Sequence, residues 1–315
     1  MKILWDHEEE KSMSSTYAPH VIAGAIKACE QLCGASQPWQ TVGNQQREFM
    51  NAFYARCVDD LGEVPEVKTF AAWTAPPISA FLAENGFPDI KIPNFQEPNL
   101  GAAGVMNVGV SWKKPGKVIT IKDPKEEAEY PGVELKRDQI SYLLEQSKHP
   151  HPIVQISTRS GDQVFMSVVD EELRETEVLR KAMELALIRK YTDRFSELRF
   201  PMVDLQESVN LAWLAGMSTQ LADGRSAIIG GAIQQTRFRM NQIGARAESA
   251  AVIYVTRGGS LVFKQPYTID RPFLLWIDRG EIYFGRRDRE HQLNFPLFAA
   301  YITPEHWKDP GDIGV

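Results

Sequence analysis

Residues 244–254 read Gly244-Ala-Arg-Ala-Glu-Ser-Ala-Ala-Val-Ile-Tyr254, and side-chain size and polarity alternate along them with a period of two. One set of alternate positions is small or apolar: Ala245, Ala247, Ser249, Ala251 and Ile253. The other set is mostly polar or larger: Arg246, Glu248, Ala250, Val252 and Tyr254. Successive side chains of a strand point to opposite faces. The pattern therefore predicts a strand whose small face fits over a crowded core.

The residues that follow predict an exposed turn with a basic side chain. Arg257, Gly258, Gly259 and Ser260 stand together, and the two glycines let the backbone turn outward. Such a turn presents Arg257 to the pocket of a trypsin-like protease. The alternative for this segment is an ordinary edge strand that ends in a Gly-Gly turn, which is a common arrangement.

Several other segments, taken in order, decide between these two interpretations. They are Val154-Gln-Ile-Ser-Thr-Arg-Ser-Gly-Asp-Gln-Val-Phe-Met-Ser167, Leu198-Arg-Phe-Pro-Met202, Asp204-Leu-Gln-Glu-Ser-Val-Asn-Leu-Ala-Trp-Leu-Ala-Gly-Met217, Arg237-Phe-Arg-Met-Asn-Gln-Ile-Gly244, Asp270-Arg-Pro-Phe-Leu-Leu-Trp-Ile277 and Ile282-Tyr-Phe-Gly-Arg286. This ordered series resembles the serpins, most clearly from residue 105 to residue 286. The resemblance is that of a shortened, divergent and viral-like member of the family.

The resemblance implies an α+β fold, with a large central mixed β-sheet, two smaller sheets, packed helices and an exposed reactive loop. It implies one domain over residues 1–315, made of a shortened part (1–104), the best-matching part (105–286) and a C-terminal extension (287–315). A protease would attack the scissile region, near Arg257, and form an acyl-enzyme. The cut loop would then insert into the main sheet as a new strand. The reactive-loop hinge comprises Gly244, Ala245, Arg246, Ala247, Glu248, Ser249, Ala250 and Ala251.

The chain also departs from the family pattern. Gln234 stands where the family has a sheet-controlling histidine, and Ala18 and Val21 stand where it has serines. Residues 94–104 leave too little chain for the helix that normally lies across the main sheet, and residues 291–315 extend past the usual family end. These departures favour the alternative function of a serpin-fold binding protein that no longer inhibits.

Catalytic and metal-binding signatures are missing from the sequence. Gly101-Ala-Ala-Gly104 lacks the remaining residues of a phosphate-binding loop, so it is interpreted as a linker. Cys29 and Cys33 lie one helical turn apart without a second pair, which predicts core thiols and not zinc ligands. His149 and His151 lack a third ligand nearby and are interpreted as surface histidines. We expect no enzyme activity, no metal and no cofactor; an unrelated enzyme would need residues brought together from distant segments.

Composition limits the partners. The 315 residues carry a formal net charge of -6, which disfavours nucleic acid, and they hold no apolar run of the length that a membrane helix needs. Three cysteines, an odd number without a framework, fit a reducing compartment. The expected protein is a soluble monomer, cytoplasmic or nonclassically exported, or secreted if a signal peptide was removed, and its expected partner is a trypsin-like serine protease.

Hydrophobic periodicity gives a coarse order of elements. It predicts helices at 18–35, 45–61, 171–194 and 205–214, a short helix carrying Ile78, a hairpin turning at 159–162, and strands at 67–74, 105–112, 198–203, 236–241 and 273–277.

Overall fold

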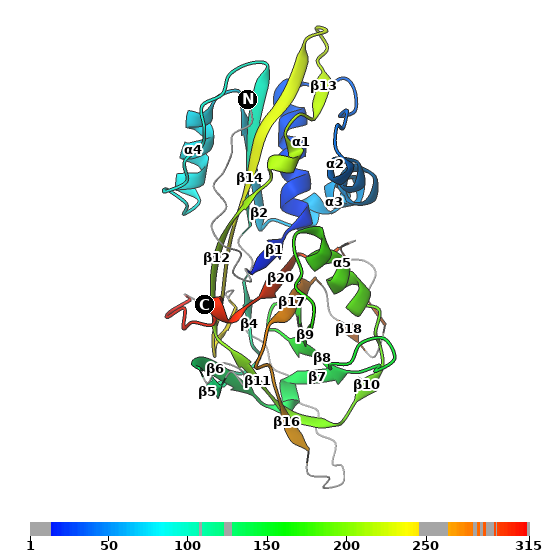
Figure 1. The fold of residues 1–315 in the computed structure, drawn as a ribbon, viewed down its shortest axis with the longest axis vertical. Helices are drawn as coiled ribbons and strands as arrows, with labels where there is room; N and C mark the ends of the chain where they lie inside the picture. The colour runs from blue at the N-terminus through cyan, green and yellow to red at the C-terminus, as the bar shows by residue number, and fades with distance from the viewer. Residues whose placement is uncertain are drawn as a thin grey trace.

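The structure, a computed structural model, describes residues 14–106, 109–122, 128–245, 264–279 and 295–313, together with 282–283, 286–287 and 293. These residues form three main sheets and several helices, as the expected α+β class requires. Figure 1 shows the long strands of one sheet in the upper part of the molecule and the other sheets below them. Within the described residues, every helix is too short or too polar to cross a membrane.

The largest sheet is antiparallel throughout its seven strands. Its order is β1 (Ser15–Tyr17), β20 (Phe298–Ile302), β17 (Phe273–Asp278), β9 (Gln163–Val168), β8 (Ile153–Ser157), β7 (Ile140–Leu143) and β10 (Tyr191–Thr192). β20 pairs with β1 on one side and β17 on the other, and all five of its residues are buried. The last part of the chain is therefore not an appendage: it supplies an internal strand of the core.

The mixed sheet contains the longest strand. Its order is β12 (Val203–Asn210), β14 (Ser226–Met240), β3 (Asn99–Met106) and β2 (Val67–Ala72), and β13 (Ser218–Gln220) also pairs with β14. β14 and β3 run parallel, whereas β12 and β2 are antiparallel to their neighbours. The two central strands therefore end at the same edge of the sheet.

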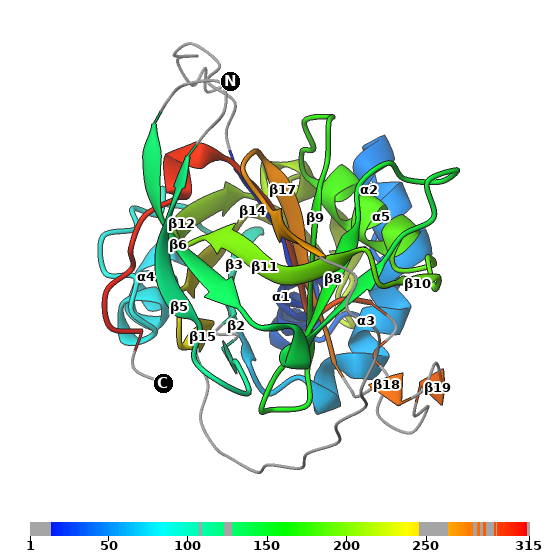
Figure 2. The ribbon, with the colours of Figure 1, turned by 90° about the horizontal axis from the view of Figure 1, so that it is seen from below.

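The smallest main sheet has the order β16 (Gln265–Thr268), β11 (Phe195–Pro201), β6 (Glu129–Leu135) and β5 (Lys117–Lys122). Two further pairs join β15 (Gly244–Ala245) to β4 (Val110–Ser111), and β18 (Ile282–Tyr283) to β19 (Arg286–Arg287). Figure 2 shows this end of the molecule, with β5, β6 and β11 in front of the mixed sheet.

The helices are short apart from the first. They are α1 (Pro19–Cys33), α2 (Asn44–Phe49), α3 (Ala55–Asp60), α4 (Ala75–Glu84) and α5 (Thr176–Leu185), with a π-helical turn at Met50–Tyr54 between α2 and α3. Short 3-10 turns lie at Leu61–Glu63, Arg137–Gln139, Ala212–Leu214 and Pro304–His306. α1 starts at a proline and ends at Gly34, whose φ of +58° reverses the chain as the sequence predicts.

Helices cover both faces of the mixed sheet, with α1 on one side and α4 on the other (Figure 1). Leu100 and Ala102 of β3 face the cluster that includes α1, while Ala103 and Val105 face the cluster that includes Ile78 of α4. Residues 94–104 hold no helix, as expected, because β3 begins at Asn99. The helix on this face, α4, comes earlier in the chain and packs on β2 and β3.

The supposed linker at residues 101–104 is the middle of β3, so that interpretation is also wrong. Its small residues are required by packing. A Cβ atom at Gly104 would lie 2.4 Å from a methyl group of Val21 in α1, and one at Gly101 would lie 2.5 Å from the ring of Phe95 on the opposite face. Glycines inside a strand commonly mark such close approaches.

Three other elements differ in type or length from those predicted by hydrophobic periodicity. Residues 203–210 form strand β12 and not a helix, because they pair along eight residues with β14, a partner too distant in sequence for a local pattern to reveal. The helix expected at 171–194 is limited to α5, since residues 191–192 pair with β7. The strand expected at 236–241 is longer, β14, and begins at Ser226.

Candidate functional site: the loop root at the end of the β3–β14 pair

The reactive loop expected from the sequence leaves the fold at β15. There Gly244 pairs with Ser111 and Ala245 with Val110, antiparallel to β4. β4 follows β3 in the chain, and β15 follows β14, so the root of the loop lies where the two parallel strands end. We call residues 241–245 the loop root. Its first two strand residues already stand in the position of a strand between β14 and the continuation of β3.

Asn241 organises the turn between β14 and β15. Its backbone N–H donates to the carbonyl of Gly244 at 2.9 Å, and its side-chain oxygen accepts the N–H of Ile243 at 2.9 Å. Its own carbonyl accepts the indole N–H of Trp112 at 2.9 Å, and its side-chain amide donates to the carbonyl of Gly311 at 3.0 Å. Asn241 is 2% exposed, so these bonds satisfy a buried polar group and hold the turn in one conformation.

The loop root is also bonded directly to the segment that follows β4. The N–H of Trp112 donates to the carbonyl of Ile243 at 3.0 Å, and the N–H of Gly116 donates to the carbonyl of Gln242 at 2.7 Å. Trp112 is fully buried and packs edge-on against Phe200. The loop root is therefore fixed, on the β4 side, by backbone hydrogen bonds and by the buried ring of Trp112.

Gly244 is required by a close approach of two backbones. A Cβ atom at this position would lie 2.4 Å from the carbonyl oxygen of Val110 and 2.6 Å from the Cα of Ser111. Backbone atoms cannot move aside as the end of a flexible side chain can. Only glycine fits here while β15 stays paired with β4.

β4 is fastened from its other side by the turn between β8 and β9. The N–H of Arg159 donates to the carbonyl of Ser111 at 2.9 Å, and Trp112 forms a bridge with Thr158. The same turn contains Asp162, whose carboxylate lies 3.4 Å from Arg279 at the end of β17. These contacts tie β4 to the seven-stranded sheet.

The structure places only part of the expected hinge and none of the expected scissile region. Gly244 and Ala245 belong to β15. The remaining hinge residues and the scissile residues lie in 246–263, outside the described residues. The three positions of departure are near the pair: Gln234 of β14 is the register partner of Gly104, and Ala18 and Val21 are fully buried at the start of α1.

Several of the histidine and cysteine side chains that were considered as catalytic or metal-binding groups are packed inside the fold. His149 is 3% exposed and its Nε2 lies 2.9 Å from the Ser167 hydroxyl, so the expectation of a surface position is wrong for this residue. Cys29 and Cys57 are buried core thiols. Among the residues that the structure describes, no group of three or more His, Cys, Asp or Glu side chains could hold a metal ion.

Burial lowers the pKa of two core histidines, His20 and His149, and also that of His306. His20 of α1 is fully buried, and this burial lowers its pKa, although the Asp60 carboxylate at 3.1 Å acts to raise it. Burial likewise lowers the pKa of His149, and the neighbouring His151 adds to the effect. Both rings are therefore held neutral in the folded protein at a pH where free histidine would begin to bind a proton.

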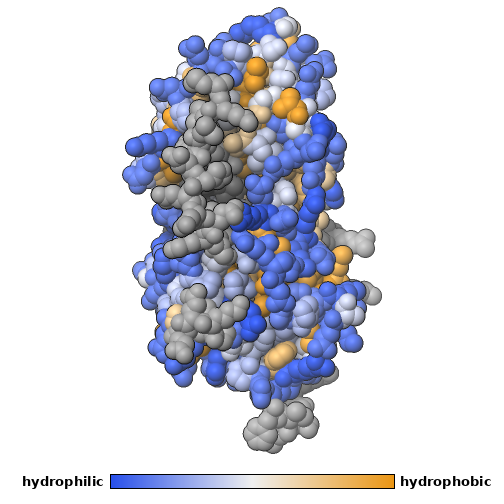
Figure 3. Space-filling view, in the orientation of Figure 1, coloured by the Kyte–Doolittle hydropathy of each residue, from blue (hydrophilic) through white to orange (hydrophobic). Residues whose placement is uncertain are grey.

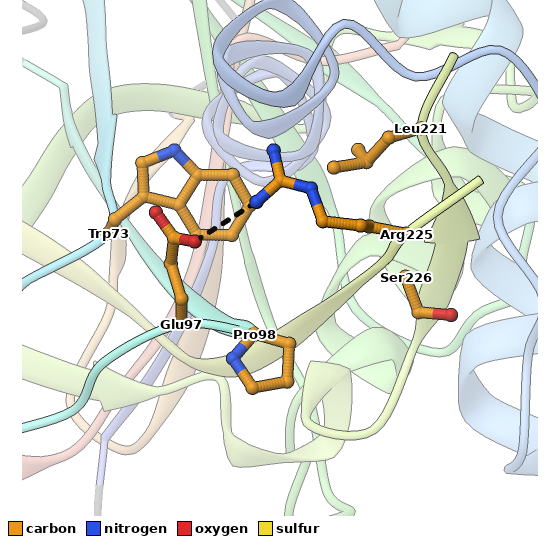
Figure 4. A pocket seen from close by; sticks show the side chains of 6 residues that line it. All are labelled: Trp73, Glu97, Pro98, Leu221, Arg225 and Ser226. Atoms are coloured by element: carbon orange, nitrogen blue, oxygen red, sulfur yellow. Dashed lines mark hydrogen bonds and ion pairs between the residues drawn. The ribbon is translucent and has the colours of Figure 1, made fainter. Parts of the chain in front are cut away.

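A pocket of about 410 Å³ lies at the opposite end of the β3–β14 pair from the loop root. Its walls are Trp73, Glu97, Pro98, Leu221, Arg225 and Ser226. Figure 4 shows the ion pair between Arg225 and Glu97, 3.2 Å long, in front of the indole ring of Trp73. The charged groups that line this pocket are thus already paired with each other.

The described residues form no broad apolar area on the face shown in Figure 3. On the face shown in Figure 3, apolar side chains form small patches separated by hydrophilic residues. The exposed large apolar residues among the described ones are dispersed in the chain: Leu32, Val42, Phe70, Val118, Leu187, Tyr191 and Ile243. Only Ile243 belongs to the loop root, where its side chain is 36% exposed.

Sequence reasoning missed Asn241 and Trp112 as residues of this site, and Phe95 as the residue that packs on Gly101 of β3. Asn241 and Trp112 act through hydrogen bonds between segments about 130 residues apart, which no local spacing reports. The sequence held one indication of the role of Asn241: it stands at the end of a strand, three residues before a glycine, as in a turn closed by an Asn side chain. The sequence held no such indication for Phe95, because Gly101, which makes room for its ring, is its neighbour only in the folded chain.

Comparison with solved structures identifies the architecture. A serpin from Schistosoma mansoni superposes with a TM-score of 0.58 at 12% identity, covering 92% of this chain and 95% of the other. The chain has the serpin fold. Serpin48 of the insect Tenebrio molitor, described as a highly specific serpin, gives a TM-score of 0.51 at 12% identity and covers 92% and 91% of the two chains.

A serpin-fold protein named for ligand binding is equally similar. Human thyroxine-binding globulin, in complex with thyroxine, gives a TM-score of 0.55 at 9% identity, again with 92% of this chain covered. No protein-family model and no curated protein sequence matches the chain. The neighbours thus include a protein described as a highly specific serpin and one in complex with thyroxine, and the identities of 9–12% show the fold alone.

Proposed function

We propose that this serpin-fold protein is a suicide-substrate inhibitor of proteases, whose loop inserts between β3 and β14 after cleavage. The observation that carries the proposal is the loop root. β15 leaves the end of a parallel strand pair and is already antiparallel to the strand that continues β3. A strand that extended β15 in this direction would be antiparallel to both neighbours, which is the favoured pairing for a strand returning through a short turn.

Two independent registers agree on where the loop would go. Continuing the pairing of Gly244 with Ser111 by five residues brings Ser249 opposite Met106. Continuing the turn that bonds Asn241 to Gly244 by five residues brings Ser249 opposite Thr236. Met106 and Thr236 are already register partners in the β3–β14 pair. An inserted strand would therefore meet both neighbours without a shift.

The same register supports the two faces of the loop predicted from the sequence. Met106 and Thr236 are buried on the core side, so Ser249 would point inward together with the small residues at 245, 247 and 251. Arg246 and Glu248 would point outward, beside Arg239 and Arg237. Arg237 is exposed, so Glu248 would gain a cationic neighbour without being buried.

Insertion would be favourable because a strand between two others gains a ladder on each side and sacrifices only the one between β3 and β14. The net gain is about one hydrogen bond for each inserted residue, each contributing on the order of 1 kcal/mol. Eight or nine residues would then stabilise the cut form by several kcal/mol.

A basic residue at Arg257 supports a trypsin-like target.

The experiment has two measurements. Incubation with trypsin-like proteases should give a covalent complex that survives detergent, and cutting the loop should raise the melting temperature. A matched pair of variants tests the geometry: Ala247→Glu would bury a charge on the inward face and should abolish both effects. Arg246→Glu, on the outward face beside Arg239, should preserve them. Simple cleavage without a complex, at an unchanged melting temperature, would overturn the proposal.

One observation favours a second function, that of a non-inhibitory binding protein. In the register above, Tyr254 would point outward over Gly101, but the ring of Phe95 and the side chain of Ile78 already fill that position. Insertion would then stop before Tyr254. If this obstruction prevented insertion altogether, loop cleavage would leave the melting temperature unchanged, and the fold would serve to bind a ligand, as thyroxine-binding globulin binds thyroxine.

A further inference from the structure

The C-terminal tail crosses from the seven-stranded sheet to the loop root. Its first part is anchored by Trp307, which is 1% exposed and packs against Tyr130 of β6 and Phe273 of β17. The hydroxyl of Ser14 also bonds to the N–H of Thr303 at 3.0 Å. Figure 2 shows the tail, in red, running along the outside of the molecule and ending beside β15.

The far end of the tail is attached to the end of β14. The Asn241 side chain donates to the carbonyl of Gly311 at 3.0 Å, and the Arg239 guanidinium reaches the carbonyl of Asp312 at 3.5 Å. Residues 308, 309, 311 and 312 are exposed, whereas Ile313 is fully buried. The far end of the tail is therefore attached by the backbone carbonyls of Gly311 and Asp312 and by the buried side chain of Ile313.

The conformation of the tail is set locally. The N–H of Gly311 donates to the Asp309 carboxylate at 2.9 Å, and Gly311 has a φ of +67°, which is accessible to glycine with little strain. This turn directs the carbonyls of Gly311 and Asp312 toward β14. The contact with Asn241 thus results from a preformed bend and a buried anchor on either side of it.

We propose that residues 308–313 are a strap that positions the loop root through Asn241, and that the strap must detach before the β3–β14 pair can open. Arg239 and Asn241 belong to β14 and its turn, whereas β4, on the other side of the pair, is tied to the β8–β9 turn. The strap joins the β14 side to the seven-stranded sheet. It also lies against Arg239, on the face where the outward side chains of an entering strand would have to pass.

The strap rests on the proposed function for its role in insertion, but its hold on the loop root can be measured without a protease. Amide exchange of the intact full-length protein reports the bonds of the root directly, at Asn241, Trp112 and Gly116. Truncation after Trp307, and separately Ile313→Ala, should accelerate exchange at these amides by about tenfold, as expected for the loss of a hydrogen bond and a buried anchor. Lys308→Ala, at an exposed position of the same segment, is the matched control and should have no effect.

The internal reference is the amide of Arg159, bonded to Ser111 on the other side of β4, and the amide of Ile228 at the far end of β14. Both should keep their protection, which shows that the variants are folded. Unchanged exchange at Asn241, Trp112 and Gly116 in both variants would overturn the strap, and so would equal acceleration of the two reference amides, because that would indicate general destabilisation.

Loop insertion is measured in a separate experiment. The loop is cut, and the melting temperature is then measured at successive times to follow its increase. The strap predicts a faster gain in the truncated protein than in the full chain. An equal rate in both would refute its control of opening. If neither protein gains stability, the proposed inhibitory function fails, and the exchange experiment alone decides whether the strap holds the root.

Discussion

A side chain at position 244 should dislodge the loop root from β4. In Gly244→Ala the new Cβ would lie 2.4 Å from the Val110 oxygen and 2.6 Å from the Ser111 Cα, about 1 Å too close for either contact. Relief by backbone movement costs about 1–3 kcal/mol. Losing the bonds from Trp112 to Ile243 and from Asn241 to Gly244 adds about 1 kcal/mol for each.

The total, about 3–5 kcal/mol, corresponds to a drop of roughly 5–8 °C in the melting temperature of the intact protein. Thermal unfolding followed by circular dichroism measures it. Gly62→Ala is the matched control, because a Cβ there meets no atom within 4 Å and the residue does not have a left-handed φ. It should change the melting temperature by less than about 2 °C. If Gly244→Ala melts like the wild type, and the Trp112 amide keeps its protection from exchange, the pairing of β15 with β4 is not what holds the loop root.

Two further outcomes are expected. Phe95→Ala should lower the melting temperature of the intact protein but enlarge the gain after loop cleavage, because it vacates the space over Gly101; Phe87→Ala, which removes a buried ring elsewhere in the same cluster, should lower the first without enlarging the second. The free energy of unfolding should fall as the pH drops below about 6.5, by up to about 1.4 kcal/mol per pH unit for each histidine, because burial lowers the pKa of His20 and His149 and the unfolded chain binds these protons first. Urea unfolding at pH 7.5 and 5.5 measures this, and equal or greater stability at pH 5.5 would contradict it.

The loop root shows how far a local pattern can lead. The period-two alternation after Gly244 predicts a strand with a small inward face, and the insertion proposed from the registers of β15 and β14 uses the same division of faces. The domain boundaries at 104 and 286 and the scissile region remain predictions. Asn241, which holds the root by four hydrogen bonds, has partners in β15, in the segment after β4 and in the C-terminal tail, so its role depends on three parts of the chain meeting.

Strand interpretations failed where the partner was distant. Residues 101–104 looked like a linker because glycine and alanine carry no strand preference, yet they form the centre of β3, where Val21 and Phe95 press on the two glycines from opposite faces. Residues 205–214 looked helical because their apolar spacing was read without knowledge of β14. In both cases the secondary structure of the segment is decided by the strand that it pairs with, and not by the segment's own residues.

By itself, the sequence determined the elements whose hydrogen bonds close within a few residues, namely α1 with its glycine stop and the hairpin of β8 and β9. It also held the ordered series of segments that resembles the serpins. Only the tertiary structure decided that β3 and β14 run side by side, that the loop root is seated between their ends, and that the C-terminal tail is attached there. The reason is physical. A helix or a tight hairpin supplies its own bonding partners, whereas a parallel strand pair and a strap acquire theirs from residues about 70 to 130 positions away, where no periodicity in the chain can indicate them.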